Sequence, residues 1–97
     1  MAIRALNEAE IAAEMKKAPL WRREGKEIAR VFQFGSFMES IRFVNALAEA
    51  AEKADHHPDM LIQYSKVTVR LSTHDCDGLS GRDFALAQVA DTLGSRC

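Results

Sequence analysis

All three histidines of the chain lie between residues 56 and 74, at His56, His57 and His74. The reference pKa of the imidazole ring, ~6.5, lets histidine both donate and accept a proton near neutral pH. Three imidazoles that meet at one place are therefore suited to general acid and base catalysis. Whether they meet depends on the elements that carry them.

A β-hairpin is the element that would bring the three histidines together. Pro58 disfavours helical geometry at His57, so a preceding helix must end before the histidine pair. Strands are expected over residues 60–64 and 66–72, with His74 just beyond the second of them. In an antiparallel pair, the start of the first strand and the end of the second lie at the same edge of the sheet. We therefore expect the three imidazoles to converge at that edge.

Two other interpretations of the histidines have to be weighed. Adjacent histidines before a proline also occur in loops exposed to water, and three histidines could supply an open catalytic zinc site. Against a metal site, no two histidines have the spacing that puts both ligands on one side of a helix or strand, and Cys76 and Cys97 have no partner motif. We therefore expect no metal ligand in this chain and proton transfer as the chemistry.

Three further residues each have a structural and a functional interpretation. Asp83 lies three residues after Ser80, which is the spacing of a capping box at a helix start and explains the aspartate without any other role. Tyr64 is most simply a core or interface aromatic at a strand end. Glu52 lies on the last turn of a helix, where the helix dipole disfavours a carboxylate, and this favours a role beyond solvation. None of the three is persuasive alone.

Capping signals predict three helices, and the longest carries an apolar stripe at the three-to-four spacing of a buried face. Gly94 is expected to end the last helix. The predicted helices span residues 8–17, 37–53 and 81–93, beginning after Asn7, Ser36 and Ser80. The predicted stripe of the longest helix consists of Phe37, Ile41, Val44, Leu47 or Ala48, and Ala51.

Between the helices the sequence predicts two hairpins. The first covers residues 20–34 around a polar turn at residues 23–26, and the second is the histidine hairpin. The element order is therefore α-β-β-α-β-β-α. This order favours an α+β, two-layer domain in which helices cover one face of a four-stranded antiparallel sheet.

Length and composition limit the alternatives. The chain has 97 residues, 47% of them hydrophobic, which fits one domain over residues 1–97 with a small core that self-association would help to stabilise. Its 13 basic and 14 acidic residues argue against a nucleic-acid partner, which needs a basic excess. No apolar run approaches the ~20 residues that cross a bilayer, and the start of the chain lacks the layout of a signal peptide. We expect a cytoplasmic protein without a membrane partner, whose two cysteines are reduced and incidental.

The spacing of the candidate residues resembles the signature of the pterin-4a-carbinolamine dehydratase family. The series runs Glu52, three residues, His56-His57-Pro58, five residues, Tyr64, nine residues, His74, eight residues, Asp83. The stretches at residues 71–75 and 78–83 are also similar to the family, and the likeness extends more loosely upstream to Trp21. One departure is Met60, where many members have tryptophan; it touches no proposed proton carrier.

The resemblance implies a lyase that dehydrates 4a-hydroxytetrahydropterin, a small-molecule substrate, to quinonoid dihydropterin with neither metal nor redox cofactor. By position, His56 and His74 would be the proton-transfer pair, and His57 would chiefly bind and orient the pterin. Glu52 and Asp83 would hold imidazole tautomers or contact the polar edge of the pterin. The remaining substrate-binding or supporting positions are Pro58, Tyr64, Ser72 and Thr73.

The resemblance also implies partners. Members of the family form homodimers or homotetramers, and aromatic amino acid hydroxylases produce their substrate, which makes a hydroxylase a pathway partner. In the alternative function, the chain would be a dimerisation or co-activator protein that binds a partner helix through its oligomer surface. Phe43 and Ala46, which lie off the predicted stripe, would serve that surface.

Overall fold

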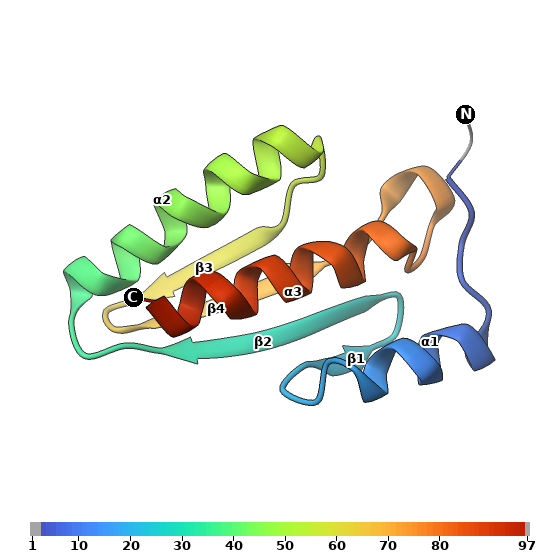
Figure 1. Ribbon diagram of the computed structural model, residues 1–97, viewed down its shortest axis with the longest axis horizontal. Coiled ribbons are helices and arrows are strands. Elements are labelled where there is room, and N and C mark those ends of the chain that lie inside the picture. Colours follow the sequence, from blue (N-terminus) through green and yellow to red (C-terminus); the bar gives the residue numbers. More distant parts are fainter. Residues whose placement is uncertain (1–2, 97) are drawn as a thin grey trace.

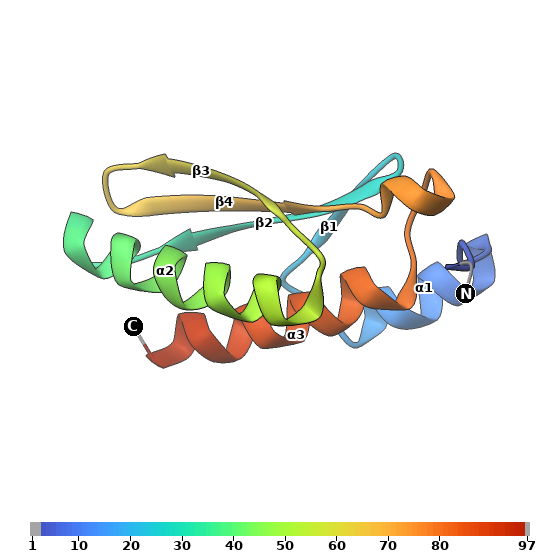
Figure 2. The same cartoon turned by 90° about the horizontal axis from the view of Figure 1, so that it is seen from above.

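The computed structural model describes residues 3–96, which form a sheet of four strands covered by helices on one face (Figure 1). Seen from above, all three helices lie on the same side of the sheet (Figure 2). The predicted α+β architecture and element order are confirmed, with one short 3₁₀ helix, η1, added after the last strand. The elements are α1 (Glu8–Lys16), β1 (Arg22–Glu24), β2 (Glu27–Gln33), α2 (Phe37–Ala54), β3 (Asp59–Gln63), β4 (Lys66–Leu71), η1 (His74–Cys76) and α3 (Gly81–Arg96).

The strands are antiparallel and follow the order β1-β2-β4-β3, so β1 and β3 are the edge strands. In β2 and β4, Ile28 pairs with Leu71, and both side chains are buried on the helix-covered face. Because side chains alternate along a strand, the neighbouring residues Glu27 and Arg70 lie on the opposite, helix-free face. The sheet therefore has a packed face and a polar face, as the alternation in residues 66–72 predicts.

The buried face of α2 differs from the predicted stripe. The fully buried residues of α2 are Ser40, Phe43, Leu47 and Ala51. Phe43 is 0% exposed and its ring lies 4.5 Å from that of Phe32, whereas Phe37 is 46% exposed. The expectation that Phe43 lies on a free association surface is therefore wrong. The cause is that α2 packs against both α3 and β4. These contacts bury the helix face that carries Phe43 instead of the predicted stripe.

Gly94 does not end the last helix, which continues to Arg96. A Cβ atom at this position would lie 2.7 Å from Cδ2 and Cε2 of Phe32. The glycine is therefore explained by the close approach of α3 to an aromatic ring of the sheet, a requirement that only the packed structure reveals.

Asp91 holds α3 on the sheet. Its Oδ1 accepts a hydrogen bond of 2.9 Å from Trp21 Nε1 and pairs with the Arg30 guanidinium. Arg30 also lies over the Phe32 ring, with its guanidinium carbon 4.0 Å from the ring centroid. This cation–π contact and the ion pair position the first hairpin against the helix layer.

The packing of Gly94 can be tested with alanine. In an open helix, glycine to alanine is stabilising by up to ~1 kcal/mol. At this site the added methyl group meets Phe32, so we expect Gly94→Ala to lower the free energy of unfolding by about 1–3 kcal/mol in urea titrations. Gly81→Ala is the matched control, because a Cβ there meets nothing within 4 Å. A Gly94→Ala protein as stable as the wild type would contradict the close contact.

Candidate active site

The end of α2 determines where the first two histidines lie. Asp55 adopts left-handed geometry, with φ 50° and ψ 43°, which aspartate tolerates better than most residues. The amide groups of Asp55 and His56 donate to the carbonyl oxygens of Glu52 and Ala51, at 3.1 Å each. This helix end turns the chain sharply, so that the His56 side chain is buried and the His57 side chain is exposed.

His56 is bound to a buried carboxylate. Its Nε2 lies 2.6 Å from Oδ1 of Asp83, which is fully buried in the first turn of α3. Oδ2 of Asp83 accepts hydrogen bonds from Thr73 Oγ1 at 2.8 Å and from the Ser80 amide at 2.9 Å. The Ser80 contact is the capping interaction that the sequence predicts. The His56 contact shows that the same carboxylate also positions an imidazole.

The hydrogen-bond chain around Asp83 has a defined direction. An ionised carboxylate only accepts, so both His56 Nε2 and Thr73 Oγ1 donate to Asp83. The Thr73 hydroxyl has one proton, and therefore the Ser80 hydroxyl, 2.7 Å away, donates to it. In neutral His56 the proton is thus on Nε2, and Nδ1 is the nitrogen free to exchange a proton with a substrate.

His57 has its own carboxylate partner on the surface. Its Nε2 lies 2.6 Å from Oε1 of Glu52, one turn back on α2. The side chains are 59% and 78% exposed, so water screens this pair far more than the His56–Asp83 pair. Both of the carboxylates expected to hold imidazole tautomers therefore contact an imidazole.

His74 lies on a closed loop after β4. Reciprocal backbone hydrogen bonds between Thr73 and Gly78, of 2.8 and 3.3 Å, close this loop, and η1 presents His74 from it. Lys26 Nζ reaches Asp77 Oδ2 at 2.6 Å and ties the loop to the first hairpin. The Lys26 hydrogen bond and its charge lower the pKa of Asp77, and the charge of His74 adds to this effect. Within residues 3–96, the His74 side chain makes no hydrogen bond.

All three histidines line one cavity of about 180 Å³ at the edge where β3 starts and β4 ends. Ser72 and Thr73 line it as well, and Asp83 lies behind His56 without reaching it. The hairpin geometry thus brings the imidazoles together as predicted. The full lining is Ile3, Asp55, His56, His57, Ser72, Thr73, His74, Asp75 and Arg82.

Four of the residues predicted for the site do not line this cavity. Glu52 and Asp83 contact its histidines from outside, whereas Tyr64 and Pro58 contact none of them through a hydrogen bond or ion pair in the described part of the chain. Tyr64 lies in the β3–β4 turn, with φ 54° and 71% exposure, at the far end of the hairpin from the histidines. The strand length between them separates Tyr64 from the site within one chain. Pro58 leads into β3 and sets its direction, with no place in the cavity lining.

Ser80 and Arg82 are residues to which sequence reasoning assigned no role at the site. Ser80 was expected only as a helix cap, and its hydroxyl contact with Thr73 depends on the tertiary fold. Arg82 brings a guanidinium to the histidine cavity. The available signals for it were its position beside Asp83 and its place in the stretch at residues 78–83 that is similar to the family.

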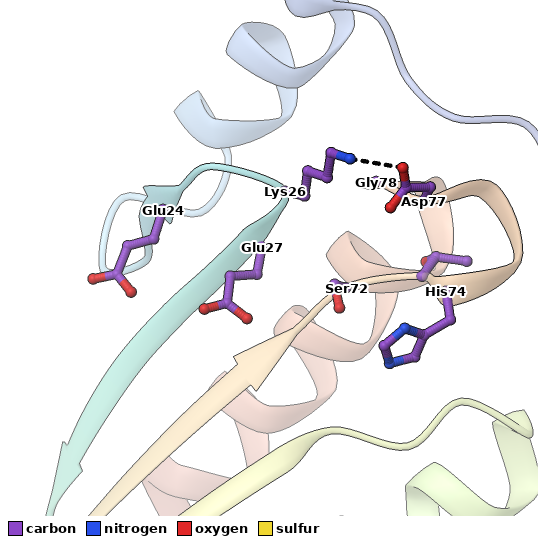
Figure 3. Close-up of a pocket in the computed structure, with 8 residues that line it drawn as sticks. Glu24, Lys26, Glu27, Ser72, His74, Asp77 and Gly78 are labelled. Atoms are coloured by element: carbon purple, nitrogen blue, oxygen red, sulfur yellow. Dashed lines mark hydrogen bonds and ion pairs between the residues drawn. The ribbon is translucent and has the colours of Figure 1, made fainter.

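A second cavity, of about 370 Å³, adjoins the first and shares Ser72, Thr73 and His74 with it. Its other side is formed by charged residues of the first hairpin and of the loop after β4 (Figure 3).

No group of three or more His, Cys, Asp or Glu side chains within residues 3–96 is arranged to hold a metal ion. Over the same residues, no helix is long and apolar enough to cross a bilayer.

Comparisons with known proteins show the family of this chain. The profile of the family described as pterin 4 alpha carbinolamine dehydratase matches residues 4–93. A relative from Picosynechococcus sp., named "Putative pterin-4-alpha-carbinolamine dehydratase", is 50% identical over 91% of this chain and 96% of its own length. A relative of the same name from Nocardia farcinica is 45% identical over 96% of this chain and 98% of its own.

Two solved structures are similar in fold. A protein from Brucella melitensis described as a transcriptional coactivator/pterin dehydratase superposes with a TM-score of 0.91 and 29% identity, over 94% of this chain and 99% of that one. A pterin dehydratase-like protein described as a RuBisCO assembly factor in the alpha-carboxysome superposes with a TM-score of 0.67 and 28% identity, over 76% and 88%. From its profile match and its relatives, the chain belongs to the pterin 4 alpha carbinolamine dehydratase family.

Proposed function

We propose that this chain dehydrates 4a-hydroxytetrahydropterin to quinonoid dihydropterin by histidine acid and base catalysis. The observation that carries the proposal is the single cavity lined by three imidazoles, two of them bound to carboxylates, in a member of this family. A hydroxylase that forms the 4a-hydroxypterin would act one step earlier.

The elimination balances with proton transfers alone. A base takes the proton from N5, and the electron pair of that bond forms the double bond between N5 and C4a. The bond between C4a and the hydroxyl oxygen breaks, and an acid protonates the departing oxygen to give water. Two proton carriers facing one bound ring can supply both transfers, each worth ~10²–10⁴-fold in rate.

The environments of the histidines favour a division of roles. His56 suits the base, because the Asp83 carboxylate at 2.6 Å stabilises the positive charge that the ring gains when Nδ1 takes a proton. His74, on the exposed rim, suits the acid that releases water to solvent. His57 and Arg82 would contact the polar edge of the pterin from the wall of the cavity.

Replacing the proton carriers tests the proposal. We expect His56→Ala and His74→Ala each to lower turnover of a 4a-hydroxytetrahydropterin by at least about tenfold in a stopped-flow assay. Thermal melting is measured alongside, because the buried His56 also satisfies Asp83. Lys16→Ala, exposed on α1, is the control and should keep the wild-type rate. Wild-type rates in both histidine variants would refute the assignment.

The two carboxylates should differ in importance. Asp83→Asn keeps the size of the side chain but removes the buried charge beside His56, and we expect kcat to fall by about tenfold or more. Glu52→Gln should change kcat by less than about threefold, since that pair is exposed and screened. Equal effects of the two substitutions would argue against the proposed role of Asp83.

We also propose that the chain self-associates through the end of the molecule opposite the histidines. There α2 begins and β3 ends (Figure 1), and exposed large side chains lie on these two elements and in the β3–β4 turn. β3 is an edge strand, so a second copy of β3 can pair with its free backbone side. The exposed residues are Phe37, Met38, Leu61, Ile62 and Tyr64.

Light scattering after size-exclusion chromatography tests this surface. We expect a dimer or tetramer for the wild type and at least a tenfold weaker association for Leu61→Glu, which puts a charge on the pairing edge. Leu20→Glu is the matched control, because Leu20 is similarly exposed but lies outside the surface. A monomeric wild type would refute self-association.

A pull-down that recovers only this protein would count against the co-activator alternative.

A further inference from the structure

The chain segment before α1 passes along the histidine cavity. Ile3 is one of the residues that line this cavity. Ala5 lies beside the loop that carries His74, since a Cβ atom at Gly78 would be 4.0 Å from Cβ of Ala5. In Figure 1 the segment runs beside the loop after β4 on its way to α1. It therefore forms one side of a site whose other walls come from the α2–β3 connection, the loop after β4 and the start of α3.

A single anchor fixes this segment to the fold. The Leu6 amide donates to the carbonyl oxygen of Leu79 at 2.8 Å, and the Leu6 side chain packs against the core to which Leu79 belongs. Within the described part of the chain, residues 3–5 make no backbone–backbone hydrogen bond. The stretch before Leu6 can therefore move away from the cavity without breaking the sheet or the helices.

An ion pair on the surface sets the course of the segment toward the cavity. Nη1 and Nη2 of Arg4 donate to the two carboxylate oxygens of Glu10 at 2.8 and 2.7 Å, and Oε1 of Glu10 also accepts from the Asn7 amide. These hydrogen bonds, those from Arg4 first, lower the pKa of Glu10 to about 2. Glu10 therefore stays charged over the pH range in which histidines titrate. The bidentate geometry holds Arg4 in one direction, and Ile3 follows from it.

Ile3 differs in kind from the rest of the cavity. Among the described residues that line it, Ile3 is the only apolar one. The imidazoles, hydroxyls and charged groups can meet the nitrogen and oxygen atoms at the edges of a pterin. The flat faces of the conjugated ring offer no such atoms, and burying a face against an aliphatic side chain removes both from water. An aliphatic residue in a polar cavity is thus suited to hold a ring by its face.

We propose that residues 3–6 form a strap that closes over the histidine cavity when a pterin is bound, with Ile3 packed on a face of the ring. The inference rests on the proposed dehydratase function and adds to it a substrate contact from outside the histidine hairpin. Ile3 carries no proton, so its contact is equal before and during the bond changes. Losing such a contact raises KM and leaves kcat nearly unchanged.

Shortening the Ile3 side chain tests the contact by kinetics. We expect Ile3→Ala to raise the KM of a 4a-hydroxytetrahydropterin by about five- to tenfold, the size expected when part of an aliphatic side chain is lost from a contact, with kcat within about twofold. Ile3→Leu should keep most of the affinity. Leu20→Ala is the matched control, because Leu20 is an exposed apolar residue that lines neither cavity. An unchanged KM in Ile3→Ala would overturn the contact.

Nuclear magnetic resonance tests the same contact without turnover. The probe is pterin itself, a stable aromatic ring, added to protein labelled at the isoleucine δ1 methyl groups. We expect the Ile3 methyl signal to move upfield, as a methyl group over the face of a ring does, and to show a nuclear Overhauser effect to the pterin protons. The methyl signals of Ile11 and Ile28, which are buried in the core, should stay in place. A bound pterin that leaves the Ile3 signal unchanged would overturn the strap.

The two experiments separate the strap from the function on which it rests. Turnover by the wild type with an unchanged KM in Ile3→Ala overturns the strap and leaves the dehydratase. A wild type that binds pterin against Ile3 but dehydrates no 4a-hydroxytetrahydropterin overturns the function and leaves the strap. If pterin does not bind and no substrate is turned over, both are overturned.

Discussion

The carboxylate of Asp83 joins three segments of the chain that are distant in sequence. It accepts from His56 at the end of α2, from Thr73 at the end of β4 and from the Ser80 amide at the start of α3. A fully buried charge is costly unless it is hydrogen-bonded, so these three segments must meet in one arrangement for the charge to be tolerated. The same arrangement orients His56 with Nδ1 free, which makes one constraint serve both fold and site.

The two ends of the β3–β4 hairpin carry different surfaces, a histidine site at one end and an apolar surface at the other. One end of it carries the imidazoles and both cavities, and the other end carries Tyr64 and the exposed apolar side chains near the start of α2. Association at the apolar end would leave the histidine end open to a substrate. A small domain can therefore gain stability from a second copy without covering its site.

Much of the site followed from local signals. Pro58 ends helical geometry before the histidines, and antiparallel pairing then places His74 at the same sheet edge. The buried face of α2 was predicted less well, because α2 offers two adjoining apolar faces and only its contacts with α3 and β4 select the one that carries Phe43. Tyr64 lies at the turn end of the hairpin, as the predicted strands over residues 60–64 and 66–72 require, and is therefore distant from the histidine cavity within one chain.

By itself, the sequence determined the element order, the helix caps and the convergence of three imidazoles, because these depend on backbone geometry over short stretches. Only the tertiary structure decided that Asp83 binds His56, that Gly94 is required by the Phe32 ring, and that the paired charges of Glu24, Glu27 and Lys26 form a cavity beside His74. The physical reason is that these are contacts between separate elements. Their distances depend on how the helix layer and the two hairpins pack, which no local pattern encodes.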